Sequence, residues 1–237
     1  LQEGLLATEL PEVPGFESAA VYEPASGEAD IGGDFFDVFD LGDGSFAIVV
    51  GDVSGKGAEA AAYTAMAKYM LRAFAIRNAQ PASVLYHLNN ALVTGFGEDR
   101  FATLMYALFD PAEHKLTIAV GGHPPPLLYR AATDEVEAVT VSGSIVGAFE
   151  DQAFDQTSFT LGPRDVMLAF TDGLVEARRG GGELFDKERV VDSLARHAHG
   201  ASATQVTQSV FGDAKSFGEI NDDTVVFALV CTEDGSR

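Results

Sequence analysis

The sequence predicts an α+β fold in which a central antiparallel β-sandwich is flanked by pairs of helices. Three observations lead to this class. Short segments rich in β-branched and aromatic residues come in blocks, helical segments come in pairs between those blocks, and the two types do not alternate one by one. Regular alternation would instead predict a parallel, doubly wound sheet.

The first block contains three strands, each bounded by Gly, Pro or Asp turns: ESAAVYEP, FFDVFDL and SFAIVVGD. A long helix is expected over about 58–77, and a second one over about 83–94, after Pro81. Seven residues of the long helix recur at helical spacing and predict one buried apolar stripe. They are Ala62, Ala65, Met66, Tyr69, Met70, Ala73 and Phe74.

The second block predicts the strands FATLMYALFD, KLTIAVGG, PLLYR, EVEAVTV, DQTSFTL and DVMLAFTD, then helices over 187–199 and 203–217 and a last strand, TVVFALV. At the other end, Leu1, Leu5, Leu6 and Leu10 have helical spacing before Pro11. We therefore expect an amphipathic helix and linker to an upstream module over 1–14, and one domain over 15–232. A local helix packed on its own domain is the alternative.

Charge and composition exclude several classes of protein. Fifteen Lys and Arg against 36 Asp and Glu give a net charge of −21, which argues against nucleic-acid binding and against docking on anionic lipid. The one cysteine, Cys231, excludes a disulfide framework and is expected to be a buried structural thiol. No segment has the length of a membrane span and no signal peptide is evident, so a cytoplasmic location is expected.

Three segments share a pattern in which an apolar strand is predicted to end in an aspartate held among small residues. They are IGGDFFD with Asp34, AIVVGDVSGKG with Asp52 and MLAFTDG with Asp172, and the acidic pair Asp222 and Asp223 precedes the last strand. Carboxylates that converge at a sheet edge repel one another unless a cation neutralises them. Oxygen ligands without a Cys or His cluster favour magnesium or manganese.

Two other readings of these motifs fail. GGDFF differs from a diguanylate cyclase signature because Phe35 stands where that signature has an acid. GDVSGKG lacks both the glycine spacing and the Ser or Thr after lysine that a phosphate-binding P-loop needs.

The ordered series GGDFFDVF, GDVSGKG, FATLMYALFDP, GGHPPPLL, FTDGLVEAR and DDTVV resembles the SpoIIE-type (RsbU-like) branch of the PPM metal-dependent serine/threonine protein phosphatases. The resemblance covers residues 1–230. It implies two Mn²⁺ or Mg²⁺ ions and a metal-bridging water as the nucleophile. No catalytic nucleophile from the protein is then required, in keeping with the lack of a Cys-His or Ser-His pattern.

The same resemblance implies roles for individual ligands. Asp52 would bridge both metals, with Asp34 and the backbone carbonyl of Val53 completing one shell. Asp172 would hold the second metal together with an acid of the last motif. Counting back from Thr224 reaches Asn221, a one-residue deletion reaches Asp222, and Asp223 is also open. We favour Asp222, because a neutral amide binds a hard cation less well.

Two further residues have competing interpretations. Lys56 could contact phosphate from the SGKG loop, or could simply cap the following helix and be solvated. His123 in GGHPPP could act as a general acid, or could belong to a rigid corner set by the proline run.

The resemblance also implies a partner: a phosphorylated anti-anti-sigma (STAS) type protein in partner-switching control of transcription. An upstream sensor domain and a homodimer through the N-terminal helix are further expectations. The alternative is a catalytically silent module of the same fold that only binds a partner or senses a signal.

Overall fold

Two compact units make up the computed structural model, which describes residues 10–25, 32–96 and 100–232. Each unit contains one five-stranded sheet, and the strand pairs in both sheets are antiparallel. A pair of long helices packs on each sheet. The predicted α+β class, with antiparallel sheets flanked by helix pairs, is confirmed.

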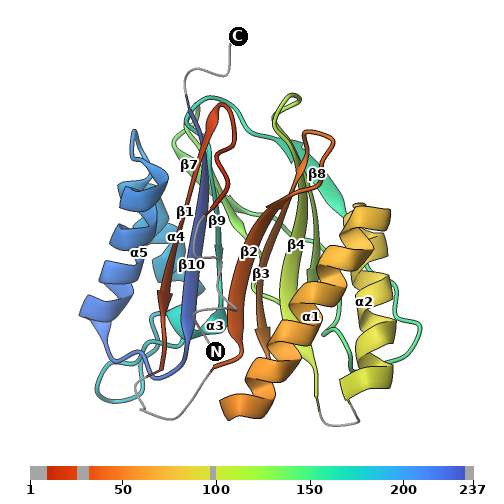
Figure 1. Ribbon diagram of the computed structural model, residues 1–237. Helices are drawn as coiled ribbons and strands as arrows, with labels where there is room; N and C mark the ends of the chain where they lie inside the picture. Colours follow the sequence, from red (N-terminus) through yellow and green to blue (C-terminus); the bar gives the residue numbers. More distant parts are fainter. Residues whose placement is uncertain (1–9, 26–31, 97–99, 233–237) are drawn as a thin grey trace. The chain divides into compact units, whose positions relative to one another are not determined.

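The first unit orders its strands β2-β3-β4-β5-β8. Helices α1 and α2 connect β3 to β4 and lie side by side against this sheet (Figure 1). The apolar core between them includes Phe35, Leu71, Leu88 and Tyr106. The elements are β2 (Asp34–Asp40), β3 (Phe46–Val53), α1 (Gly57–Arg77), α2 (Pro81–Phe96), β4 (Ala102–Asp110), β5 (Lys115–Gly121) and β8 (Thr157–Thr160).

The second unit orders its strands β1-β10-β9-β6-β7. Its first and last strands come from opposite ends of the chain and pair over their whole length, from Phe16 opposite Cys231 to Glu23 opposite Thr224. The elements are β1 (Phe16–Glu23), β6 (Leu127–Arg130), β7 (Glu135–Ala138), β9 (Val166–Phe170), α3 (Asp172–Val175), α4 (Asp186–His197), α5 (Ala203–Phe217) and β10 (Thr224–Cys231).

The buried face of α1 differs from the predicted stripe. Tyr69, a member of that stripe, is 60% exposed, and Ala73 is exposed as well. Apolar residues occur on every side of this alanine-rich helix, so their spacing does not select a face. The small alanines let the helix approach the sheet closely, and Lys68 on that face meets the buried carboxylate of Asp37. The buried residues are Ala60, Ala61, Thr64, Ala67, Lys68, Leu71 and Ala75.

Three other expectations have different outcomes. The predicted N-terminal helix falls mostly on residues 1–9, outside the described residues, and stays a prediction. Cys231 is buried, and burial raises the pKa of its thiol, as expected for a structural cysteine. Within the described ranges, every helix is too short or too polar to cross a bilayer.

Candidate metal centre

Asp34 and Asp52 lie opposite each other on the first sheet. Asp34 begins β2, so the prediction that it ends a strand is wrong, while Asp52 is the penultimate residue of β3 as predicted. Because the two strands are antiparallel, the start of β2 and the end of β3 lie at the same end of the sheet. The Cα atoms pair in register, and a carboxylate oxygen of one residue lies within 4.8 Å of a carboxylate oxygen of the other. Asp34 is buried and Asp52 is half-buried. Two carboxylates this close favour a cation between them.

Gly33 brings the backbone of Val53 against this pair. The Val53 amide donates a hydrogen bond of 3.1 Å to the Gly33 carbonyl. A Cβ atom on Gly33 would overlap the Val53 carbonyl oxygen and lie 2.5 Å from Oδ1 of Asp52. The glycine before Asp34 is therefore required by close packing, and it leaves the Val53 carbonyl beside two carboxylates. This is the donor set of hard oxygens that magnesium and manganese prefer.

Asp172 lies just after the end of strand β9 in the second sheet. Strand β9 ends at Phe170. The next residue, Thr171, contacts the last strand, because its hydroxyl accepts a hydrogen bond of 2.8 Å from the Val225 amide. Asp172 then opens the four-residue helix α3, which the sequence analysis did not anticipate. A Cβ atom on Gly173 would overlap the Asp223 carbonyl oxygen, so this glycine lets the last motif pack against the start of α3.

The acids of the last motif have different surroundings. Asp223 is buried, and its carboxylate accepts a hydrogen bond of 2.7 Å from the Ala25 amide. Asp222 is exposed, and its carboxylate accepts a hydrogen bond of 3.0 Å from the Asp223 amide. Burial raises the pKa of Asp172, and the negative charges of Glu176 and Asp222 raise it further. A raised carboxyl pKa means that the ionised form is unfavourable, and a bound cation would reverse that.

The structure bears on the competing interpretations of His123 and Lys56. The His123 ring is buried, and its Nδ1 lies 3.1 Å from the Thr103 hydroxyl. Thr103 pairs with Asp52 across β3 and β4, so His123 supports the strand beside the carboxylate pair. Lys56 is exposed at the residue before α1 and makes no side-chain capping hydrogen bond. Lys56 therefore occupies the expected N-cap position and is solvated, but its side chain does not cap the helix, because an ammonium is a donor and cannot accept from helix N–H groups.

Sequence reasoning missed two ionic contacts within the first unit. Arg100 donates hydrogen bonds of 3.1 Å to the Ser54 carbonyl and 2.9 Å to the Glu59 carboxylate. These two bonds link the loop after Asp52 to the start of α1. Asp37 accepts hydrogen bonds of 2.6 and 2.8 Å from Arg72 on α1. The sequence contained one indication of the contact between Asp37 and Arg72: Asp37 is an acid among phenylalanines on an apolar strand.

The chain matches a family model and several known proteins. The model described as Stage II sporulation protein E (SpoIIE) matches residues 42–231. The phosphoserine phosphatase RsbU of Bacillus subtilis is 25% identical over 231 residues, which cover 97% of this chain and 67% of that protein. Protein IcfG of Synechocystis is 28% identical over 221 residues, and the chain spans only 34% of its length.

A solved structure of the RsbU and RsbW domains of Rv1364c from Mycobacterium tuberculosis is also similar to this chain. It has a TM-score of 0.81 and 29% sequence identity, and the match covers 94% of this chain and 62% of that one. Both the sequence and the fold of this chain therefore match known proteins. The matched regions include the four candidate ligands Asp34, Asp52, Asp172 and Asp222.

Proposed function

This chain belongs to the SpoIIE family, in the PPM phosphatase class, and we propose that it is a metal-dependent protein serine/threonine phosphatase. The observation that carries the proposal is the carboxylate pair of Asp34 and Asp52, with ligand oxygens within 4.8 Å at one sheet edge. Two ionised carboxylates at this distance repel each other. A divalent cation removes that cost, so the pair is better explained as a metal site than as a structural feature.

The proposed ligands would hold two Mn²⁺ or Mg²⁺ ions. Asp52 would contribute to both metal sites, with Asp34 and the Val53 carbonyl at one site and Asp172 and Asp222 at the other. Asp222 is favoured over Asp223, because the Asp223 carboxylate already anchors the Ala25 amide while Asp222 adds its charge to the surroundings of Asp172. Two bound divalent cations would supply an activated water and offset charge on the phosphoryl group.

The protein's own residues then serve as ligands and supports. Gly33 and Gly173 allow the backbone to approach at the two aspartate motifs, and His123 braces Thr103 on the strand next to Asp52. No protein side chain is assigned as the nucleophile. Lys56 is exposed beside the Asp52 loop, and a contact between its ammonium group and a phosphate remains a prediction.

The proposed substrate is phosphoserine or phosphothreonine on an anti-anti-sigma (STAS) type protein. Support comes from RsbU of Bacillus subtilis, which carries the name phosphoserine phosphatase and matches along nearly all of this chain. We further propose that residues 15–232 form the phosphatase domain. Residues 1–14 would connect it to an upstream sensor and contribute to a homodimer.

Hydrolysis of p-nitrophenyl phosphate tests the activity without knowledge of the partner. We expect turnover with millimolar manganese and none in excess chelator, and Asp52→Asn should remove it while the variant keeps a cooperative thermal transition. Robust turnover in chelator would contradict the metal-dependent mechanism. Manganese binding without turnover of this ester or of a phosphoserine peptide would instead favour the silent module.

A further inference from the structure

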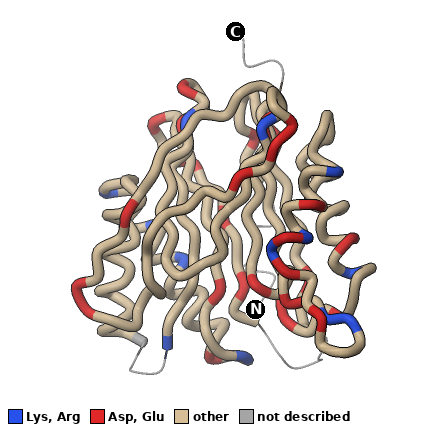
Figure 2. Tube along the Cα trace, turned by 180° about the vertical axis from the view of Figure 1, so that it is seen from behind, with Lys and Arg blue, Asp and Glu red and all other residues tan. Residues whose placement is uncertain are grey.

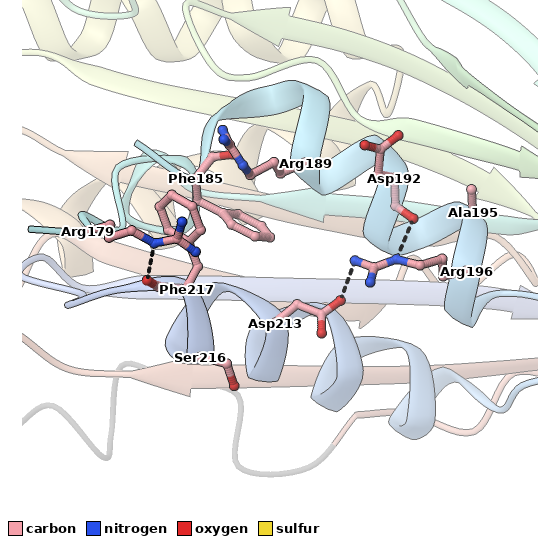
Figure 3. Close-up of a pocket in the computed structure, with 9 residues that line it drawn as sticks. All are labelled: Arg179, Phe185, Arg189, Asp192, Ala195, Arg196, Asp213, Ser216 and Phe217. Atoms are coloured by element: carbon pink, nitrogen blue, oxygen red, sulfur yellow. Dashed lines mark hydrogen bonds and ion pairs between the residues drawn. The ribbon is translucent and has the colours of Figure 1, made fainter. Parts of the chain in front are cut away.

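Several arginine side chains link neighbouring segments by donating to a carboxylate and to a main-chain carbonyl at once. The chain has 15 Lys and Arg against 36 Asp and Glu, and the basic residues are sparse along the trace in Figure 2. Figure 3 shows one such link at the cavity of about 730 Å³ between α4 and α5. There Arg196 donates hydrogen bonds of 2.9 Å to the Asp213 carboxylate and 3.2 Å to the Asp192 carbonyl. A guanidinium held in this way fixes the carbonyl that it contacts as well as the carboxylate.

Arg100 makes the same kind of contact at the loop that follows Asp52. Its Nη1 donates 3.1 Å to the Ser54 carbonyl, and its Nη2 donates 2.9 Å to the Glu59 carboxylate. The guanidinium carbon lies 5.0 Å from the centroid of the Tyr63 ring on α1. The Arg100 side chain is 21% exposed, so these three partners hold a largely covered guanidinium. Because Ser54 is only two residues beyond Asp52, Arg100 acts on the loop that carries two of the proposed ligands.

Ser54 is held at each of its polar groups. Its amide donates 2.9 Å to the Phe101 carbonyl, and its hydroxyl accepts 3.0 Å from the Phe101 amide. Its carbonyl accepts the hydrogen bond from Arg100. We name these three bonds, from Phe101 and Arg100 to Ser54, the Ser54 clamp. Because a peptide unit is planar, the amide bond to Phe101 fixes the unit before Ser54, and the bond from Arg100 fixes the unit after it.

The Ser54 clamp determines where the Val53 carbonyl points. The Val53 carbonyl and the Ser54 amide belong to one peptide unit, and in a trans peptide the C=O and the N–H point in opposite directions. The Ser54 amide points toward Phe101, so the Val53 carbonyl points toward the other neighbour of β3, the start of β2. A Cβ on Gly33 would overlap the Val53 oxygen there and would lie 2.5 Å from Oδ1 of Asp52. The clamp therefore directs this oxygen to the carboxylate pair.

The loop after Ser54 gives this orientation little support of its own. Gly55 and Gly57 have φ angles of 112° and 84°, in the region where glycine is favoured and where it has more freedom than any other residue. Arg100 also fills the space beside Gly55, because a Cβ there would overlap its Nη1. Removal of the guanidinium would therefore release the Ser54 carbonyl and leave room for the loop to change its conformation.

We propose that Arg100 is a positioning residue of the metal centre, which acts through Ser54 to hold the Val53 carbonyl in the direction that a ligand requires. This inference rests on the proposed function and deepens it, because it assigns the geometry of one metal site to a residue outside the aspartate motifs. The charge of Arg100 by itself opposes the binding of a nearby cation. Its position and its charge therefore have opposite effects on metal affinity, and the sign of the measured change separates them.

The test is a calorimetric titration of the metal-free wild-type chain and of Arg100→Met with manganese, which requires no turnover. Loss of the positive charge alone would tighten manganese binding. Loss of the positioning role should instead weaken one of the two ions by roughly 10–100-fold, the usual effect of removing a group that orients a metal ligand. Arg77→Met on α1 is the matched control, because it removes the same charge from an exposed position, and it should bind as the wild type does. Unchanged or tighter binding by Arg100→Met would overturn the proposal.

A double-mutant cycle separates positioning from a general loss of structure. In Asp34→Asn the metal site that would include the Val53 carbonyl is already lost, so Arg100→Met should leave the affinity for the remaining ion unchanged. Equal weakening in both backgrounds would overturn the proposal, because a merely structural role has that effect.

If Arg100→Met does not fold, Ser54→Ala takes its place, because it removes only the acceptor of the Phe101 amide. It should weaken the same ion to a smaller extent, and wild-type affinity in Ser54→Ala would then overturn the proposal. A wild-type chain that binds no manganese would overturn the proposed function and this inference with it, whereas the other contrary results leave the proposed function intact.

Discussion

Replacing Asp37 by Asn tests how the first unit holds α1 against its sheet. The Asp37 side chain is 2% exposed and faces two cations of α1. It accepts hydrogen bonds of 2.6 and 2.8 Å from Arg72, and Lys68 lies 3.7 Å away. The substitution keeps the size of the side chain but removes its charge, so two cations are left facing a neutral amide.

The magnitude follows from the exposure of the two cations. Breaking a buried ion pair from one side costs about 3–5 kcal/mol, because the remaining charge stays buried without compensation. Arg72 is 37% exposed and can turn toward water, whereas Lys68 is only 8% exposed and cannot. We therefore expect a loss near the lower limit, about 3 kcal/mol. For a chain of this size that corresponds to a fall in Tm of roughly 6–12 °C.

Lys68→Met provides the second side of a double-mutant cycle. Burial lowers the pKa of Lys68 even though Asp37 attracts its charge, so the ammonium itself opposes folding at neutral pH. Lys68→Met should be close to neutral, and in its background Asp37→Asn should cost about 1–2 kcal/mol less. Urea denaturation of the four proteins measures both quantities. A loss below about 1 kcal/mol for Asp37→Asn, or strict additivity in the cycle, would refute this reasoning.

Three further predictions concern the aspartate motifs and the second unit. Gly33→Ala should weaken manganese binding by at least about tenfold in calorimetric titration, because its Cβ must displace the Val53 carbonyl; unchanged affinity would contradict the close-packing argument. Asp222→Asn should lower manganese affinity with little change in Tm. Asp223→Asn should lower Tm, because it loses the anionic acceptor of the Ala25 amide. Thermal scans with and without metal check both, and a larger fall in Tm for Asp222→Asn than for Asp223→Asn would contradict the assignment. Ser202→Ala should cost about 1 kcal/mol of unfolding free energy and leave metal affinity unchanged, because Ser202 and Gln205 form the capping box of α5.

Much of the fold could be predicted because its signals are local. Every long helix and every predicted strand from ESAAVYEP to TVVFALV has a counterpart in the structure, since turn residues and β-branched runs identify each one separately. The pairing of β1 with β10 could not be derived from such patterns. It joins residues more than 200 positions apart, and only tertiary packing selects it.

The burial of α1 shows where periodicity loses its power. Its predicted stripe included Tyr69, which is exposed, and omitted Lys68, which is buried. A helix with alanine on every side can present several faces to a sheet, and here the choice follows close packing of small side chains and the charge of Asp37. Lys68 and Arg72, four residues apart on one helix face, were the signal in the sequence that an acid lies opposite.

The candidate site was predictable as a set of residue types rather than as geometry. Glycines beside Asp34 and Asp172 pointed to close backbone approach, and the structure identifies the groups approached as the Val53 and Asp223 carbonyl oxygens. The different surroundings of Asp222 and Asp223 could not be read from two identical side chains. They arise from the Ala25 amide, which lies 198 positions away from Asp223 in the chain.

Calorimetric titration of the metal-free chain with manganese tests the central claim most directly. The account predicts saturable binding of two ions per chain, loss of both in Asp52→Asn, and loss of one in Asp34→Asn and in Asp172→Asn. Asp37→Asn should retain both ions below its melting temperature. The Asp37 side chain points from β2 toward α1, whereas Asp34, three residues earlier on the strand, points to the opposite face. A folded chain that binds no manganese, or an Asp52→Asn variant that binds it as the wild type does, would contradict the account.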